Sequence, residues 1–130
     1  MKILMNYISL SRLDKPIGIY LLLWPSLLGL FLGGLNEGYI DFKNYVIVIV
    51  GAILVRSCGC VVNDIFDHKF DRLVERTKNR PIASGKISLK EAWMFFVILS
   101  IASFSLLLLT PPVTIKLALS FSLLILIYPL

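Results

Sequence analysis

Four long apolar segments, separated by polar stretches, organise the sequence. They cover residues 17–34, 45–62, 92–109 and 113–130. The first and third contain no charged residue, while Arg56 lies near the end of the second and Lys116 near the start of the fourth. Each segment is about 18 residues long, close to the length that an α-helix needs to cross a bilayer core. None shows the polar stripe at helical period that a soluble helix of this length carries. The pattern predicts an all-α, polytopic transmembrane helical bundle with about four helices.

Residues at the ends of the segments support these helix limits. Pro16 precedes the first segment and suits the first turn of a helix, where its missing N–H costs nothing. Asp41 is a suitable N-cap for the second helix. Ser88 and Glu91 have the spacing of a capping box just before the third segment. The prolines at 111–112 predict a tight break between the third and fourth helices.

The amino-acid composition is typical of an integral membrane protein. Hydrophobic residues make up 58% of the 130 residues and charged residues 16%, whereas a soluble domain carries roughly 25% charge. Disordered, collagen-like and disulfide-scaffold classes are excluded by the same numbers. Residues 1–15 mix apolar and polar positions and lack a signal-peptide cleavage site, so they are predicted to form an amphipathic helix at the membrane interface.

Charge predicts the topology of the chain in the bilayer. Ten of the thirteen basic residues precede the first apolar segment or lie in residues 63–90, on the same side of the membrane if alternate loops are counted together. The positive-inside rule therefore predicts that the N-terminus and the segment 63–90 are cytoplasmic. Because topology accounts for the net charge of +5, no nucleic-acid partner is predicted.

An aspartate-rich run directly follows the second apolar segment. If that helix continues past the membrane surface, Asp64, Asp67 and Asp71 lie on one face of it, and Asn63 lies one turn before Asp67. Like charges on one helix face repel each other, so a cation is needed to offset them. Mg²⁺ prefers carboxylate and phosphate oxygens. We therefore predict a Mg²⁺ site at the carboxylates of Asp64, Asp67 and Asp71.

Basic residues are interleaved with the aspartates and suit the oxygens that a metal leaves free on a diphosphate. The candidates for this role are Lys69, Arg72, Arg76 and Arg80, with Lys78 beside them. Arg56, about two helical turns before Asp64, is a further candidate because a charge inside an apolar segment is costly. The alternatives are a solvated loop whose charges only set topology, and an Arg56 side chain that extends to the nearby interface.

The run from 63 to 85 resembles the signature of the membrane-intrinsic UbiA prenyltransferase family. The shared positions are N-D-x-x-D-x-x-x-D from Asn63 to Asp71, then Arg76-Thr77, Arg80-Pro81 and Gly85. Further stretches are similar to the 4-hydroxybenzoate branch of that family. They are residues 14–18, 22–25, Arg56 with 59–62, and Tyr128-Pro129.

The resemblance implies a Mg²⁺-dependent aromatic polyprenyltransferase in the bacterial inner membrane. Such an enzyme ionises a polyprenyl diphosphate and attaches the prenyl group to position 3 of 4-hydroxybenzoate, a step of ubiquinone biosynthesis. Carried over by position, Asp64, Asp67 and Asp71 are the expected catalytic and metal-binding carboxylates, and Asn63 is a further expected metal ligand. The expected diphosphate contacts are Asn63, Arg56, Lys69, Arg72, Arg76 and Arg80, with Arg76 and Arg80 favoured as parts of the signature.

One departure from the family pattern shapes the expected function. Family members carry a second aspartate-rich motif and about nine membrane helices, whereas this sequence has no Asp after Asp71 and four apolar segments. The sequence is therefore expected to be an N-terminal portion that does not catalyse transfer alone. Two alternatives stay open. One is transfer to another acceptor of the family, such as haem, a naphthoate or chlorophyllide, and the other is a non-catalytic membrane fragment.

Overall fold

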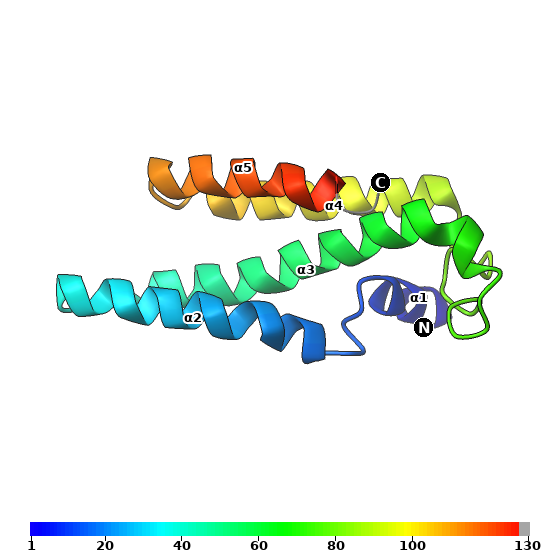
Figure 1. Cartoon of the computed structure of the whole chain (residues 1–130), viewed down its shortest axis with the longest axis horizontal. Helices are drawn as coiled ribbons and strands as arrows, with labels where there is room; N and C mark the ends of the chain where they lie inside the picture. The colour runs from blue at the N-terminus through cyan, green and yellow to red at the C-terminus, as the bar shows by residue number, and fades with distance from the viewer. Residues whose placement is uncertain (128–130) are drawn as a thin grey trace.

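The computed structural model describes residues 1–127, and these form five α-helices without a strand (Figure 1). The helices are α1 (Lys2–Leu10), α2 (Ile17–Glu37), α3 (Phe42–Asp71), α4 (Leu89–Leu107) and α5 (Pro112–Ile127). The four longer helices lie side by side along the long axis, and short α1 lies at one end, beside the loop that follows α3 (Figure 1). The predicted all-α class is confirmed.

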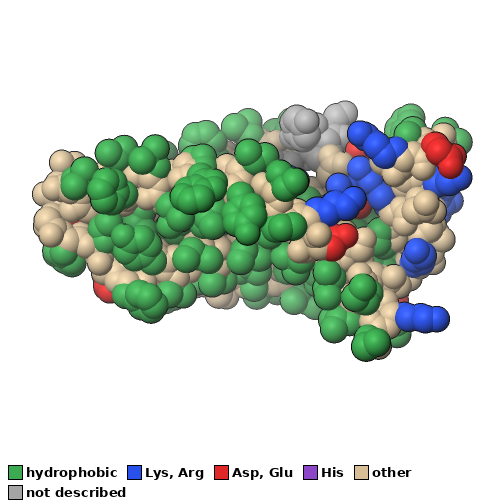
Figure 2. Space-filling model, turned by 90° about the horizontal axis from the view of Figure 1, so that it is seen from below, with side chains coloured by type: hydrophobic (Ala, Val, Ile, Leu, Met, Phe, Trp, Pro, Cys, Tyr) green, Lys and Arg blue, Asp and Glu red, His purple; other side chains and the backbone are tan. Residues whose placement is uncertain are grey.

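Three of these helices are long and apolar enough to cross a membrane. They are α2, α3 and α4, while the apolar part of α5 is shorter, at Pro112–Leu124. The last residues of the predicted fourth span, 128–130, lie outside the described residues. Hydrophobic side chains cover most of the face in Figure 2, and Lys and Arg gather at one end. No residue of α2 is buried, as expected for a helix whose apolar side chains face lipid.

Several residues singled out at the helix starts lie at cap positions. Pro16 occupies the N-cap position of α2, and the Asp41 side chain accepts a hydrogen bond from the Lys43 amide at the start of α3. The capping box of Ser88 and Glu91 forms as predicted, with the Ser88 amide donating to Glu91 Oε2 over 2.8 Å. Helix α3 runs on to Asp71 and α4 begins at Leu89, so residues 63–71 and 89–90 of the segment 63–90 are helical.

Helix α3 is the centre of the structure, because α1, α2, α4 and α5 all pack against it. The buried core lies at the end of α3 that carries the aspartates. Its members come from α1, α3, α4 and the loop between α3 and α4, namely Leu10, Val61, Ile65, Ile82, Ile87 and Ala92. The rings of Tyr7 and Phe95 extend it, with centroids 5.0 Å apart. This apolar cluster holds the N-terminal helix and the loop against α3, next to the charged residues.

Local hydrogen bonds fold the loop 72–88 back onto α3. The Thr77 hydroxyl donates to the Asp71 carbonyl over 3.1 Å, and Arg72 Nε donates to the Ala83 carbonyl over 3.1 Å. Gly85 has a φ of 74°, in the left-handed region that glycine adopts without strain. The loop therefore has a defined path, which places Arg80 beside the aspartate face of α3.

Candidate functional site: a polar cavity at the charged end of the bundle

The aspartate face predicted from the sequence exists because α3 continues as a regular helix to Asp71. Asp64 is 1% exposed and Asp71 is 7% exposed, so both carboxylates are buried, whereas Asp67 is half-buried. A buried carboxylate must be paired, because leaving water costs an isolated charge several kcal/mol. The structure pairs the two buried ones with arginines.

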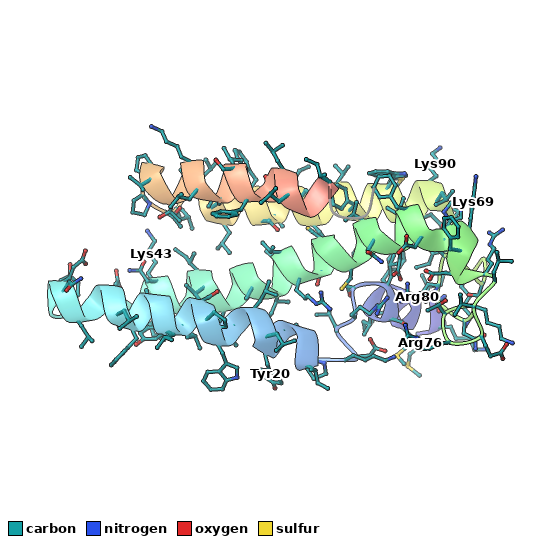
Figure 3. All side chains as sticks on the ribbon, in the orientation of Figure 1. Tyr20, Lys43, Lys69, Arg76, Arg80 and Lys90 are labelled. Atoms are coloured by element: carbon teal, nitrogen blue, oxygen red, sulfur yellow. The ribbon has the colours of Figure 1, made fainter. Side chains whose placement is uncertain are left out.

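Arg80 bridges the two buried carboxylates. Its Nη1 donates to Asp71 Oδ2 over 2.7 Å and to Asp64 Oδ1 over 3.1 Å. Arg80 lies in the loop after α3, at the same end of the molecule as α1 (Figure 3). Arg80, predicted as a diphosphate contact, is thus paired directly with two of the aspartates, and its contact with diphosphate stays a prediction.

Arg12 is a site residue that the sequence analysis missed. Its Nη2 donates to the same oxygen, Asp64 Oδ1, over 2.9 Å. Within the described chain it is the one residue other than glycine with a positive φ, at 57°. The sequence held one usable signal, an arginine at the membrane interface just before a helix, but we counted Arg12 only toward topology.

The remaining acidic position of the signature is paired locally. Asn63 Nδ2 donates to Asp67 Oδ2 over 3.0 Å, one helical turn along α3. The His68 side chain also has a hydrogen-bond partner, because its Nδ1 lies 2.7 Å from the carbonyl oxygen of Ile65. Asp67 and Asn63 thus form a pair separate from the Arg80 bridge.

A cavity of about 590 Å³ opens beside this charged cluster. Its polar lining consists of Arg12, Arg56, Asn63, Asp64 and Arg80, and its apolar lining includes Leu22, Val55, Phe121 and Leu124. Two buried polar atoms here, Arg56 Nε and Asp64 Oδ2, have no hydrogen-bond partner among the described residues. Because buried polar atoms are nearly always paired in native proteins, both atoms mark the cavity as a place for a polar ligand.

Arg56 is held at the cavity wall by its contact with α2. A Cβ atom added at Gly18 would lie 2.5 Å from Arg56 Nε, so the guanidinium occupies space that the missing side chain of Gly18 leaves. This placement favours a functional role for Arg56 over extension of the side chain to the interface.

The other predicted diphosphate contacts do not reach the cavity. Lys69, Arg72 and Arg76 are exposed and do not line it. Arg72 instead donates to the loop carbonyl of Ala83. Of the predicted set, the structure brings together Arg56, Asn63, Asp64 and Arg80, with Asp71 joined to them through Arg80.

The predicted Mg²⁺ site stays a prediction. Among residues 1–127, no group of three or more His, Cys, Asp or Glu residues is arranged to hold a metal ion. The donors that are present nevertheless fit a hard cation, because Asp64 Oδ2 is unpaired at the cavity wall and Asn63 lies beside it. Asp64 Oδ1 and Asp71 Oδ2 are both engaged by arginine.

Comparison with known proteins decides the family. Residues 22–130 match the sequence profile of the UbiA prenyltransferase family. The chain belongs to this family. It is 53% identical over 118 residues to a 4-hydroxybenzoate octaprenyltransferase of Vesicomyosocius okutanii, covering 91% of the chain and 42% of that relative. A Pseudomonas aeruginosa protein of the same name is 50% identical over 113 residues, with 87% and 38% covered.

A solved structure agrees with the fold. It is a digeranylgeranylglyceryl phosphate synthase in membranes, 30% identical, with a TM-score of 0.83 over 99% of this chain and 44% of that one. The UbiA chain described here therefore spans about two fifths of the length of the curated relatives it matches.

We predict that Arg80 supports the fold of this UbiA chain as well as its site. Replacing Arg80 with Ala leaves Asp71 without a partner and Asp64 with Arg12 alone, so the free energy of unfolding should fall by about 3 kcal/mol. Unfolding in mixed detergent micelles, followed by circular dichroism, measures this loss. Lys78→Ala is the matched control, because its exposed pair with Glu75 should contribute at most about 1 kcal/mol. Equal losses would contradict the prediction.

Proposed function

We propose that this chain supplies the first part of a membrane enzyme that transfers a polyprenyl group from polyprenyl diphosphate to position 3 of 4-hydroxybenzoate in ubiquinone biosynthesis. The observation that carries the proposal is the mixed lining of the cavity. Three arginines and Asp64 line it together with aliphatic and aromatic side chains. A prenyl diphosphate likewise combines an anionic head with an apolar chain.

The geometry suggests how the residues present act on this substrate. The bond between the allylic carbon and the diphosphate oxygen breaks, and the electron pair leaves with the diphosphate. Arg56 and Arg80 then stabilise the negative charge that develops on the leaving oxygens. Leu22, Val55 and Phe121 keep water from the allylic cation until the ring carbon of 4-hydroxybenzoate attacks and a ring proton is lost.

We also propose that Asn63, Asp64 and Asp67 contribute oxygen ligands to Mg²⁺. When bound, the ion would neutralise phosphate oxygens that the arginines leave free. Asp71 then acts through Arg80. Its Oδ2 atom accepts a hydrogen bond of 2.7 Å from Arg80 Nη1 and so holds that arginine in position. Lys69, Arg72 and Arg76 are weaker candidates for diphosphate contact than Arg56 and Arg80, because they lie on the exposed surface.

The second candidate function is transfer to a different acceptor. The structural relative acts in the synthesis of digeranylgeranylglyceryl phosphate, as its name states, so one fold serves more than one acceptor. The higher identity to proteins named for 4-hydroxybenzoate favours that acceptor.

We place the protein in the bacterial inner membrane, with the N-terminus and the loop after α3 in the cytoplasm. Figure 3 supports this arrangement, because Lys69, Arg76, Arg80 and Lys90 lie at one end of the molecule and Lys43 lies toward the other. The end with the greater basic charge is expected to face the cytoplasm.

A hybrid protein tests the transfer. Residues 1–130 replace the matching part of the Vesicomyosocius relative, and membranes carrying the hybrid receive polyprenyl diphosphate, 4-hydroxybenzoate and Mg²⁺. We expect prenylated hydroxybenzoate by mass spectrometry from the hybrid, and none from membranes that carry the 130-residue chain alone. An inactive hybrid beside an active, intact relative would overturn the proposal. Product with a naphthoate but not with 4-hydroxybenzoate would favour the second candidate.

In the same hybrid, Asp67→Ala should abolish Mg²⁺-dependent transfer, because it removes an oxygen ligand from the metal. Replacing the carboxylate of Glu75 in the same way should leave turnover unchanged, since that side chain is exposed and lies beyond the end of α3. Quantitative blotting of membranes checks that both variants insert equally. Normal Mg²⁺ dependence in the Asp67 variant would contradict its metal role.

Cysteine labelling tests the topology. In a background with Cys58→Ser and Cys60→Ser, we introduce Glu37→Cys or Lys78→Cys, both at exposed positions. A membrane-impermeant maleimide added to intact cells should label position 37 and should reach position 78 only after the membrane is opened. The reverse pattern would invert the topology.

A further inference from the structure

We propose that Arg12 is an oxyanion-binding residue of the cavity, in addition to being a partner of Asp64. This inference rests on the proposed function, and it adds a binding residue from outside the region that the family profile matches, which begins at residue 22. The oxyanion would be the diphosphate of the donor or the carboxylate of the acceptor.

The charge balance of the cavity is the first argument. Its lining carries the guanidinium groups of Arg12, Arg56 and Arg80 and one carboxylate, that of Asp64. Asp71 adds a second negative charge through Arg80, yet positive charge remains in excess. Like charges that line one cavity repel each other, so a bound anion would balance this arrangement.

The hydrogen-bonding capacity of Arg12 is the second argument. Its bond to Asp64 uses one N–H of Nη2, whereas a guanidinium carries several N–H groups in a planar fork that suits phosphate and carboxylate oxygens. No other acceptor contacts this guanidinium among the described residues. Its side chain is 28% exposed and lines the cavity, so the remaining donors can reach a ligand there.

The backbone at Arg12 is the third argument. A φ of 57° costs a residue with a side chain roughly 1 kcal/mol or more. The flanking structure holds the residue there, because Leu10 and Ser11 are buried and the Ser11 hydroxyl donates to the Tyr7 carbonyl over 2.8 Å. Strained residues that are held in this way concentrate at ligand sites.

Metal-free binding of inorganic pyrophosphate tests the proposal. The 130-residue chain in lipid nanodiscs is titrated with pyrophosphate in the presence of EDTA, by calorimetry. Arg12→Asn should raise the Kd roughly tenfold, the effect of losing one charge-assisted hydrogen bond. Asn and Gly both tolerate the left-handed backbone, so Arg12→Gly should behave in the same way without added strain. Arg12→Lys, which keeps the charge, should recover most of the affinity.

A double-mutant cycle separates direct binding from support of Asp64. If Arg12 contacts the ligand, Arg12→Asn weakens binding roughly tenfold in the Asp64→Asn background as well. If Arg12 acts only by neutralising Asp64, its effect disappears in that background, and the proposal is overturned. Lys15→Asn removes an exposed charge from the same turn and should leave the Kd unchanged. Each variant is first checked for a single unfolding transition.

A second titration, with 4-hydroxybenzoate in place of pyrophosphate, identifies the source of the oxyanion. If the Arg12 variants lose affinity only for pyrophosphate, Arg12 binds the diphosphate of the prenyl donor. If they lose affinity only for 4-hydroxybenzoate, Arg12 binds the carboxylate of the acceptor. Unchanged Kd values for both ligands overturn the proposal. None of these measurements requires transfer, so a failure of the hybrid assay and a failure of this proposal remain distinguishable.

Discussion

The charged end of this UbiA chain depends on one buried carboxylate. Asp64 is 1% exposed, and at such a buried position an unpaired charge is unstable by several kcal/mol. Two guanidinium groups meet at its Oδ1 atom, from Arg12 at 2.9 Å and Arg80 at 3.1 Å. One comes from the turn between α1 and α2, and the other from the loop after α3. Satisfying this single carboxylate therefore fixes two separate segments against α3.

The apolar cluster and the ion pairs reinforce each other. Leu10 and Ile82 are buried in the same cluster, each two residues from an arginine that binds Asp64. Burial of the apolar residues lowers the entropy cost of holding the arginines in place. The arginines in turn remove the penalty that Asp64 would otherwise impose on packing at this end. The two arginines are therefore positioned by residues close to them in sequence that belong to the core.

Much of the fold could be predicted from the sequence because its signals are local. Long apolar runs indicate membrane helices, and Asp41 and the Ser88–Glu91 pair mark helix starts through hydrogen bonds within three residues. The end of α3 could not be placed from hydropathy, because the helix continues through polar residues to Asp71. Its final turns are stabilised by packing and ion pairs, which hydropathy does not register.

Helical spacing alone predicts the candidate site only where its residues are neighbours along α3, whereas Arg80 was predicted through the family signature. The face formed by Asp64, Asp67 and Asp71 follows from helical periodicity. The contact between Arg12 and Asp64 joins residues 52 positions apart, so it depends on how α1 packs and leaves no trace in local spacing. Lys69, Arg72 and Arg76 share the signature with Arg80, yet they are exposed, because the path of the loop decides which basic residue faces the carboxylates.

The excess of arginine in the cavity links ligand binding to the cohesion of this end of the molecule. Arg12 and Arg80 converge on one oxygen and repel each other, and Arg56 adds a third positive charge to the same cavity. An anion between them converts this repulsion into attraction, and a ligand that binds only the folded state stabilises that state. An anionic ligand in the cavity would then act on the same ion-pair network that joins α1, α3 and the loop. The proposed anion binding and the packing of α1 both depend on how Asp64 is neutralised.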